Sequence, residues 1–332
     1  MKKVYGYTTD PKDPRDFLNT SILNITLRLS DKCNFSCKYC SYYDNSKKHI
    51  PFEDLKLIIQ ELHKIKKFNA YKKINWYIHG GEPTVYPKFV EAMLYILDSK
   101  EIENEIEVQT NSSYKNLDKF QPLIGKNIKF VCSYQNHQNN PKQFKRFCSY
   151  MLENNLFAGT DIILENFGTP NEQENIIEIY DWLIEQKYKY NLPFNVQTNT
   201  IDGVSLEGLP ESYRKKFSNK EHKELIKVEY LNGTEEIFDY DTFTSNGKNS
   251  FKLMKCNVGL QSIIIDTTTP IIKVYKCFSD ILYNKNKPHL SLEIKDFTYN
   301  KLEKILKPTL CIHPKCICEL FVPKFNLKIK DN

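Results

Sequence analysis

The 332-residue chain lacks any apolar run of about 18 residues, the length that a membrane-spanning helix needs. Its first ten residues, MKKVYGYTTD, carry two lysines but no apolar segment of the kind found in secretory signals. The sequence therefore predicts neither a membrane span nor an export signal, and we expect the protein in the cytoplasm.

A strong excess of one charge is also missing, because 47 basic and 41 acidic residues leave a net charge of +6. The lysines are spread along the chain, whereas binding to nucleic acid needs a concentrated basic patch. Internal repeats and low-complexity tracts are absent too. The chain is 40% hydrophobic and 13% aromatic, which is typical of a globular protein. We expect no nucleic-acid partner, although an anionic substrate would suit the mild positive charge.

Alternating apolar residues predict strands, and apolar residues at helical spacing predict helices, over the first 200 residues. The predicted strands span 25–30, 74–79, 105–110, 128–133, 160–165 and 193–198. The predicted helices span 52–67, 88–97, 114–124, 142–153 and 175–188. Strands that alternate with helices predict a parallel sheet with ligands at its carboxyl edge, and six strands are too few for a complete eight-stranded barrel. We therefore predict an α/β fold, a partial (β/α)6 barrel of the TIM type, over residues 25–201.

The pattern changes after residue 200. Residues 202–255 are charged, with one weak helix predicted at 219–228, and we interpret them as an insertion or linker. Two strands are predicted at 262–266 and 271–276, and a short helix at 299–307. The predicted division is an N-terminal segment (1–24), the barrel (25–201), the insertion (202–255) and a small, separate, cysteine-bearing domain (256–332).

Three of the ten cysteines follow the first predicted strand with the spacing C-x3-C-x2-C: Cys33, Cys37 and Cys40. A disulfide framework is not expected in a reducing cytosol, but thiolates at this spacing can converge on one metal centre. Zinc takes four ligands, for which His49 is a candidate fourth. A four-iron cluster also normally takes four cysteines, so a cluster held by three would leave one iron open to bind a small molecule.

A second motif, HGGEP at residues 79–83, follows the second predicted strand. Its glycines allow close approach of the backbone, and an acceptor at the end of a strand can receive an ammonium donor. Glu82 has an alternative role, because a carboxylate is also favoured at the start of the helix that follows.

Together the two motifs resemble the radical S-adenosylmethionine (SAM) superfamily. The resemblance implies that Cys33, Cys37 and Cys40 hold a [4Fe-4S] cluster whose open iron binds SAM. One electron would then cleave SAM to a 5′-deoxyadenosyl radical, which abstracts hydrogen from a substrate. The electron would come from a donor such as flavodoxin or ferredoxin.

The same resemblance assigns contacts with SAM to residues near the ends of the first four strands. It implies that Gly80, Gly81 and Glu82 help to seat SAM and that Tyr39, just before the third cysteine, approaches the adenine. Asn111 and Ser133 would contact SAM from the ends of the third and fourth strands. Asn and Ser also favour turns, so each has a plain structural interpretation as well.

Five further cysteines lie in the last quarter of the chain: Cys256, Cys277, Cys311, Cys316 and Cys318. A C-x2-G before a hairpin, a cysteine after it and a later cysteine pair resemble the SPASM and twitch extensions of the same superfamily. The full SPASM pattern has seven cysteines and two auxiliary clusters, so five cysteines imply one auxiliary [4Fe-4S] cluster. The implied ligands are Cys256, Cys277, Cys316 and Cys318, with Cys311 as the alternate.

Other interpretations of these residues stay open. A tetrahedral zinc site would also suit the C-x-C-E segment. His313 is a possible ligand, but we expect an exposed loop histidine. Cys132 and Cys148 are expected to be small buried hydrophobic residues.

The predicted activity is that of a radical SAM oxidoreductase with an unknown substrate. A small molecule such as a sugar derivative is favoured, because about 24 residues precede the first strand and no leader-binding domain is evident. Peptide or protein modification is the alternative, and a non-catalytic zinc scaffold is an alternative of another class. The auxiliary cluster would accept an electron from the substrate radical, bind the substrate or relay electrons.

Overall fold

The structure is a computed structural model. It describes residues 5–8, 21–37, 40, 49–65, 71–163, 170–190, 211, 215, 225–229, 235–239, 242–243, 246, 250, 252, 254–283, 288–313, 316 and 324–326.

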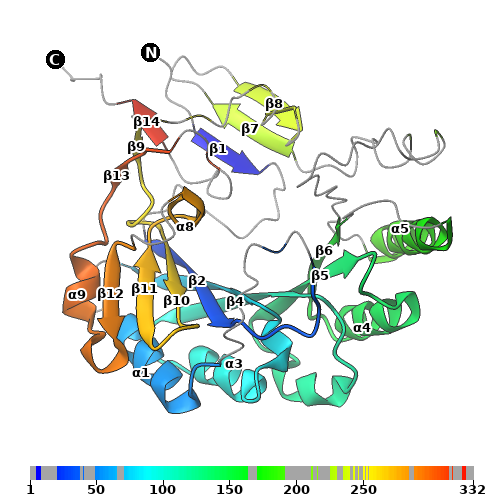
Figure 1. Ribbon diagram of the computed structural model, residues 1–332, viewed down its shortest axis with the longest axis horizontal. Helices are drawn as coiled ribbons and strands as arrows, with labels where there is room; N and C mark the ends of the chain where they lie inside the picture. Colours follow the sequence, from blue (N-terminus) through cyan, green and yellow to red (C-terminus); the bar gives the residue numbers. More distant parts are fainter. Residues whose placement is uncertain are drawn as a thin grey trace.

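An eight-stranded sheet forms the body of the molecule, with the strand order β12-β11-β10-β2-β3-β4-β5-β6 (Figure 1). Five successive parallel strands correspond to the first five predicted ones: β2 (Ile22–Ser30), β3 (Lys73–Gly80), β4 (Glu103–Thr110), β5 (Ile128–Gln135) and β6 (Phe157–Ile163). The predicted α/β fold with a parallel sheet is confirmed. The sixth predicted strand, 193–198, lies outside the described residues.

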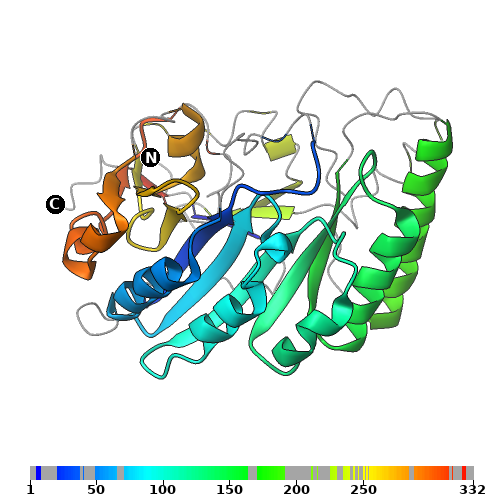
Figure 2. The ribbon, with the colours of Figure 1, turned by 60° about the horizontal axis from the view of Figure 1, so that its bottom comes forward.

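Helices cover the outer face of this sheet, each following a parallel strand (Figure 2). They are α1 (Phe52–His63), α3 (Phe89–Leu97), α4 (Pro141–Glu153) and α5 (Pro170–Tyr190). The helix predicted at 114–124 is instead the 3-10 helix η2 (Leu117–Leu123), which contains Pro122. Proline has no backbone N–H to donate and so disfavours an α-helical interior.

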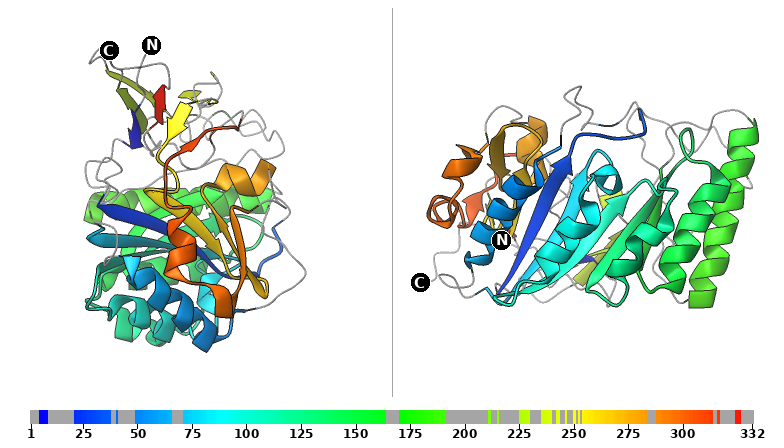
Figure 3. Two further views of the ribbon diagram at one scale, coloured as in Figure 1. Left: turned by 90° about the vertical axis from the view of Figure 1, so that its left-hand side faces the viewer. Right: turned by 90° about the horizontal axis from the view of Figure 1, so that it is seen from below.

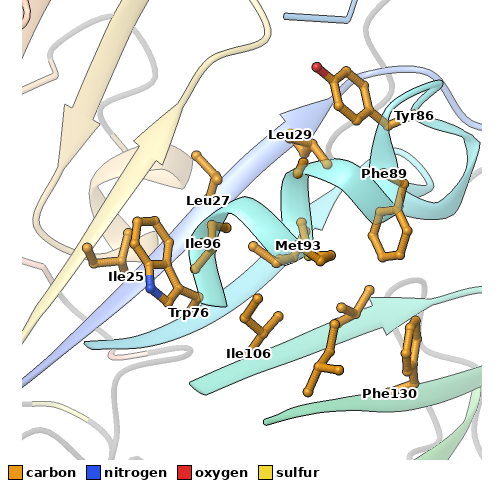
Figure 4. Close-up of a cluster of buried hydrophobic side chains, with 14 of the residues drawn as sticks. Ile25, Leu27, Leu29, Trp76, Tyr86, Phe89, Met93, Ile96, Ile106 and Phe130 are labelled. Atoms are coloured by element: carbon orange, nitrogen blue, oxygen red, sulfur yellow. The ribbon is translucent and has the colours of Figure 1, made fainter. Parts of the chain in front are cut away.

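The core lies between the sheet and these helices. All nine residues of β2 are buried, as expected for a parallel strand covered on both faces. On α3, Phe89, Met93 and Ile96 share one face and pack over the sheet, where Trp76 lies nearby (Figure 4). This packing fixes where the carboxyl ends of β2 and β3 lie.

The predicted hairpin of the last quarter is confirmed, but it is joined to the barrel sheet. β10 (Ser262–Asp266) pairs in parallel with β2, and β11 (Ile271–Tyr275) and β12 (Leu290–Glu293) continue the sheet in antiparallel fashion. A buried ion pair crosses the junction, where the Arg28 guanidinium lies 2.5 Å from Asp266 and 2.9 Å from Asp31. The cysteine-bearing hairpin is therefore held against the strand that leads to Cys33.

Two small antiparallel sheets lie near one another, on the side of the large sheet opposite α1 and α3 (Figure 3). One joins β1 (Tyr5–Thr8) to β7 (Leu225–Glu229) and β8 (Glu235–Asp239), so the N-terminal segment and the insertion share a sheet. The helix predicted at 219–228 is wrong over 225–228, which belong to β7, and its first part lies outside the described residues. The other sheet has β9 (Met254–Cys256) between β13 (Thr309–Leu310) and β14 (Lys324–Asn326).

Short helices complete the last quarter: α8 (Phe278–Tyr283), η5 (Ile294–Asp296) and α9 (Tyr299–Glu303). The helix predicted at 299–307 is thus confirmed in its first part. Within the described part of the chain, every helix is too short or too polar to cross a bilayer.

A buried histidine predicts how stability depends on pH. His63 ends α1 with 7% of its surface exposed, and its ring meets Trp76 edge-on. Burial lowers the pKa of His63 from 6.5 to about 4, although Glu101 and Asn104 act in the opposite direction. The unfolded chain therefore binds a proton that the folded chain excludes, so this stability is present above pH 6.5 and lost as the pH falls towards 4.

We expect a His63→Gln variant to lose less stability than the parent on going from pH 7.5 to pH 5.5. The expected difference is on the order of 1 kcal/mol. Urea unfolding at the two pH values measures it, and an equal pH dependence of the two proteins would contradict the assignment.

Candidate functional site

The cysteine loop leaves β2 at Ser30, at the carboxyl edge of the parallel sheet. The backbone N–H of Cys40 donates to the carbonyl oxygen of Cys37 at 3.1 Å, which turns the loop back on itself. The N–H of Phe35 donates to Cys33 Sγ at 3.3 Å. The structure thus places the three predicted cysteines on one short loop, all partly exposed.

The pKa of the Cys33 thiol depends on its burial and on its charged neighbours. Burial raises the pKa of the Cys33 thiol to about 11, and the nearby Glu82, Cys37 and Cys40 add smaller effects in the same direction. A bound metal centre overcomes the energetic cost of ionising such a buried thiol, because a coordinating thiol is deprotonated outright. The donor set of three neighbouring thiols therefore suits a cationic centre.

The two glycines of HGGEP let the end of β3 bond to the start of the cysteine loop. Gly81 N donates to Ser30 O at 2.6 Å, and Glu82 N donates to Lys32 O at 2.7 Å. A Cβ on Gly80 would fall well inside 3.0 Å of Ser30 O, and one on Gly81 would do the same against Lys32 O. Gly80 also has φ +138°, which disfavours any residue with a side chain. We call this pairing of 80–82 with 30–32 the glycine contact.

The Glu82 side chain is buried, with 1% of its surface exposed, and joins the ends of two strands. Oε1 accepts hydrogen bonds from Thr84 N at 3.0 Å, Thr84 Oγ1 at 2.6 Å and Thr110 Oγ1 at 2.7 Å, and Oε2 accepts one from Asn111 N at 2.6 Å. Burial raises the pKa of Glu82, while these hydrogen bonds oppose the rise. Glu82 is the N-cap of the 3-10 helix η1 (Pro83–Val85), whereas the predicted helix that follows, α3, has Lys88 as its N-cap.

An amide network adjoins the first cysteine. Asn111 Nδ2 donates to Asn34 Oδ1 at 3.0 Å and lies 3.8 Å from Cys33 Sγ. Asn34 Nδ2 in turn donates to Ser113 Oγ at 2.7 Å. Asn111 is thus brought to the cysteine loop, as a SAM contact would require. Sequence reasoning missed Asn34 and Ser113, although Asn34 directly follows a predicted ligand.

The remaining predicted residues of this site are less closely associated with the loop. Ser133 is buried near the carboxyl end of β5, in register with Asp161 of β6. His49, the candidate fourth zinc ligand, has Nδ1 2.7 Å from Ser30 Oγ. Tyr39 lies outside the described residues.

Four cysteines of the last quarter line one cavity of roughly 110 Å³: Cys256, Cys277, Cys311 and Cys316. Cys256 ends β9, Cys277 follows β11, and Cys311 follows β13, which pairs with β9. Cys311, predicted only as an alternate ligand, therefore stands beside three predicted ones. Cys318 lies outside the described residues.

The glycine of the C-x2-G motif, Gly259, allows the four cysteines to lie around one cavity. Gly259 has φ +85°, and a Cβ there would meet Lys307 O at 2.7 Å. Its N–H donates to Ser262 O at 2.7 Å, which closes the turn between Cys256 and β10. The segment that leads to Cys311 can therefore pass directly against the turn that follows Cys256.

A buried carboxylate connects the side chains around this cavity. Asp280 accepts a hydrogen bond from Cys277 N at 3.1 Å, and its other oxygen lies 2.7 Å from His313 Nε2. His313 is 5% exposed, so the expectation of an exposed loop histidine is wrong. The carboxylate partner explains why a histidine is buried here. Asp280 was not predicted, although its place three residues after Cys277, in the first turn of α8, offered a signal.

The two groups of cysteines differ in spacing. Among the described residues, the trio with ligand atoms all within 4.8 Å of one another is Cys277, Asp280 and His313. That spacing suits a single ion. The cysteines of a [4Fe-4S] cluster each bind a different iron, so Cys33, Cys37 and Cys40 need not lie so close together.

Comparison with known proteins adds a family and a fold. Residues 27–215 match the family model described as the radical SAM superfamily. No curated protein sequence matches significantly.

Two solved structures of anSMEcpe resemble the chain. One, of a hexahistidine-tagged form with bound AdoMet (SAM), is 18% identical with a TM-score of 0.50, covering 85% of this chain and 80% of that chain. The other, with AdoMet and the Cp18Cys peptide, is 17% identical with a TM-score of 0.51 and the same coverage. SuiB of Streptococcus suis, bound to S-adenosylmethionine, is 14% identical with a TM-score of 0.40 over 86% of this chain and 64% of that chain. The anSMEcpe structures share the fold of this chain.

The glycine contact predicts the effect of adding one methyl group. In a Gly81→Ala variant, the new Cβ would displace the backbone at Lys32, next to Cys33. Backbone strain of this kind costs about 1–3 kcal/mol, and we expect iron retained on the cysteine loop to fall about tenfold or more. Anaerobic reconstitution followed by iron and SAM-binding assays measures this loss.

A matched control for this variant is Gly125→Ala. Gly125 also has a positive φ, +75°, but a Cβ there would meet nothing within 4 Å. This control should keep its iron and its SAM binding. Equal iron and SAM binding in Gly81→Ala and the parent would show that the contact does not hold the cysteine loop.

Proposed function

Since the chain belongs to the radical SAM superfamily, we propose that it is an oxidoreductase that uses SAM to abstract hydrogen from a small molecule. The family binds a [4Fe-4S] cluster and SAM, and we assign the cluster to Cys33, Cys37 and Cys40. When bound, this cofactor pair supplies an electron to the sulfonium and a 5′-deoxyadenosyl radical to the substrate. Every other task falls to the residues of the chain.

The observation that carries this assignment is the glycine contact. It joins the cysteine loop to the end of β3 through two short backbone hydrogen bonds that only glycines permit. The three thiols therefore sit at the carboxyl edge of a parallel sheet, where such folds bind their ligands. The hydrogen bond between His49 Nδ1 and Ser30 Oγ favours a three-thiol centre over a zinc ion with His49 as its fourth ligand.

Hydrogen bonds to sulfur are one way in which a protein tunes an iron–sulfur centre. Phe35 N and Asn111 Nδ2 are the donors at Cys33 Sγ. We assign them the role of stabilising negative charge on this sulfur. Gly80, Gly81, Asn111 and Ser133 remain the proposed contacts for SAM, with the Glu82 side chain acting through its bonds to the strand ends.

At the second group of cysteines we propose an auxiliary [4Fe-4S] cluster held by Cys256, Cys277, Cys311 and Cys316. Their shared cavity supports this set, and Cys318 is the alternate. A zinc ion on Cys277, Asp280 and His313 is the competing proposal, favoured by the close spacing of those three ligand atoms. The auxiliary centre would accept an electron from the substrate, bind it or relay electrons.

Uncharged polar side chains support a neutral, hydroxyl-bearing substrate such as a sugar derivative. The segment at the end of β4, residues 110–113, consists of threonine, asparagine and serine, and the segment at 135–140 is rich in glutamine and asparagine. Such side chains both donate and accept hydrogen bonds, as hydroxyl groups do. A peptide is the second candidate, because anSMEcpe, which shares the fold, is known with a bound peptide.

The proposed function predicts cleavage of SAM by the reduced protein. Anaerobic protein mixed with SAM and dithionite should form 5′-deoxyadenosine, and Cys37→Ala should abolish this because two thiols do not hold the cluster. Cys148→Ala, which removes a fully buried thiol of the core, is the matched control and should retain the activity. Formation of 5′-deoxyadenosine by Cys37→Ala at the parent's rate would rule out the assignment.

The proposed auxiliary site predicts that its iron can be lost without loss of SAM cleavage. The parent should contain roughly eight irons per chain, as two [4Fe-4S] clusters require, and Cys311→Ala roughly four. Cys311→Ala should still cleave SAM. Loss of iron from a Cys318→Ala variant but not from Cys311→Ala would support the ligand set expected from the sequence, with Cys318 in place of Cys311. Stoichiometric zinc in place of the second cluster would support the competing proposal of a zinc site.

A further inference from the structure

A basic cavity lies outside the two cysteine sites, at the amino end of α4. Its volume is roughly 350 Å³, and its lining includes the cationic side chains of Lys115, Lys142 and Arg146. All three residues are exposed, and within the described part of the chain no ion pair involves them. We call these three residues the basic patch.

Hydrogen bonds connect the wall of this cavity to the cysteine loop. Gln143, which lines the cavity beside the basic patch, donates from Nε2 to Ser113 O. Ser113 Oγ accepts from Asn34 Nδ2, and Asn34 Oδ1 accepts from Asn111 Nδ2, which lies 3.8 Å from Cys33 Sγ. Three residues, Ser113, Asn34 and Asn111, thus connect the cavity wall to the first cysteine.

The surface beside Cys33 is open along this route. Asn34 is exposed and Cys33 is partly exposed, whereas Glu82 beneath them is buried. A partner that covered the basic patch and Asn34 would therefore lie against the residue that follows Cys33, a ligand of the proposed cluster.

We infer that the basic patch is the docking surface for an acidic one-electron carrier protein that reduces the cluster on Cys33, Cys37 and Cys40. This inference rests on the proposed function, which requires an electron from outside the chain. In the step itself, the reduced carrier loses one electron and the cluster gains it, and no bond is made or broken in either protein.

Charge explains why the patch would select such a partner. Three cations that form no ion pair within the described residues attract an acidic surface and orient it during encounter. Electrostatic steering of this kind raises association rates about 10- to 1,000-fold and weakens steeply with salt. Gln143, Ser113, Asn34 and Asn111 then form a chain of hydrogen-bonded residues from the interface to Cys33.

Charge reversal of the patch tests the inference with two reductants. In Lys115→Glu/Lys142→Glu/Arg146→Glu, we expect 5′-deoxyadenosine formation with limiting reduced flavodoxin to fall about tenfold or more at low ionic strength. With excess dithionite, a small reductant that needs no docking surface, the rate should equal that of the parent. The flavodoxin-driven rate of the parent should fall with added salt, and that of the variant should not.

A matched control carries the same charge change at the opposite edge of the sheet. Lys72, Lys100 and Lys126 are exposed residues near the amino ends of β3, β4 and β5, and their triple exchange to Glu should leave both rates unchanged. The inference is wrong if flavodoxin drives the patch variant as fast as the parent, if the control loses as much, or if dithionite also fails with the patch variant. Failure of the parent with dithionite would instead refute the proposed function.

Discussion

Two backbone hydrogen bonds, from Gly81 to Ser30 and from Glu82 to Lys32, fix the site on which the account depends. They exist because residues 80 and 81 have no Cβ, and they place the loop of Cys33, Cys37 and Cys40 against the end of β3. The buried Glu82 carboxylate then ties this point to Thr110 and Asn111 at the end of β4. A cofactor of this family therefore meets three strand ends held in one arrangement.

The second cysteine group also depends on a close backbone contact at a glycine, in a different part of the fold. Gly259, with its positive φ, lets the backbone at Lys307 pass close to the turn after Cys256. The hairpin that carries Cys277 extends the barrel sheet through β10, and Arg28 joins Asp266 of that hairpin to Asp31, two residues before Cys33. Cys277 and the first cysteine group thus follow strands of one continuous sheet, whereas Cys256 and Cys311 belong to the separate sheet of β13, β9 and β14.

Much of this could be predicted from the sequence, because the signals are local. Alternation of apolar residues located β2 to β6, and the cysteine spacing with GGEP located the first site. Contacts between distant segments could not be predicted. The pairing of β1 with β7 brings together residues more than 200 positions apart, and neither strand has a distinctive pattern. The burial of His313 depends on Asp280, and the gathering of Cys311 depends on the pairing of β13 with β9.

The central claim is that the cluster on Cys33, Cys37 and Cys40 keeps one iron open for SAM. Electron–nuclear double resonance on the reduced protein, mixed with SAM labelled with ¹⁵N in its amino group, tests this claim most directly. The account predicts a hyperfine coupling between the cluster spin and the labelled nitrogen, absent from Cys37→Ala. A cluster spectrum unchanged by labelled SAM, at concentrations that saturate binding, would contradict it.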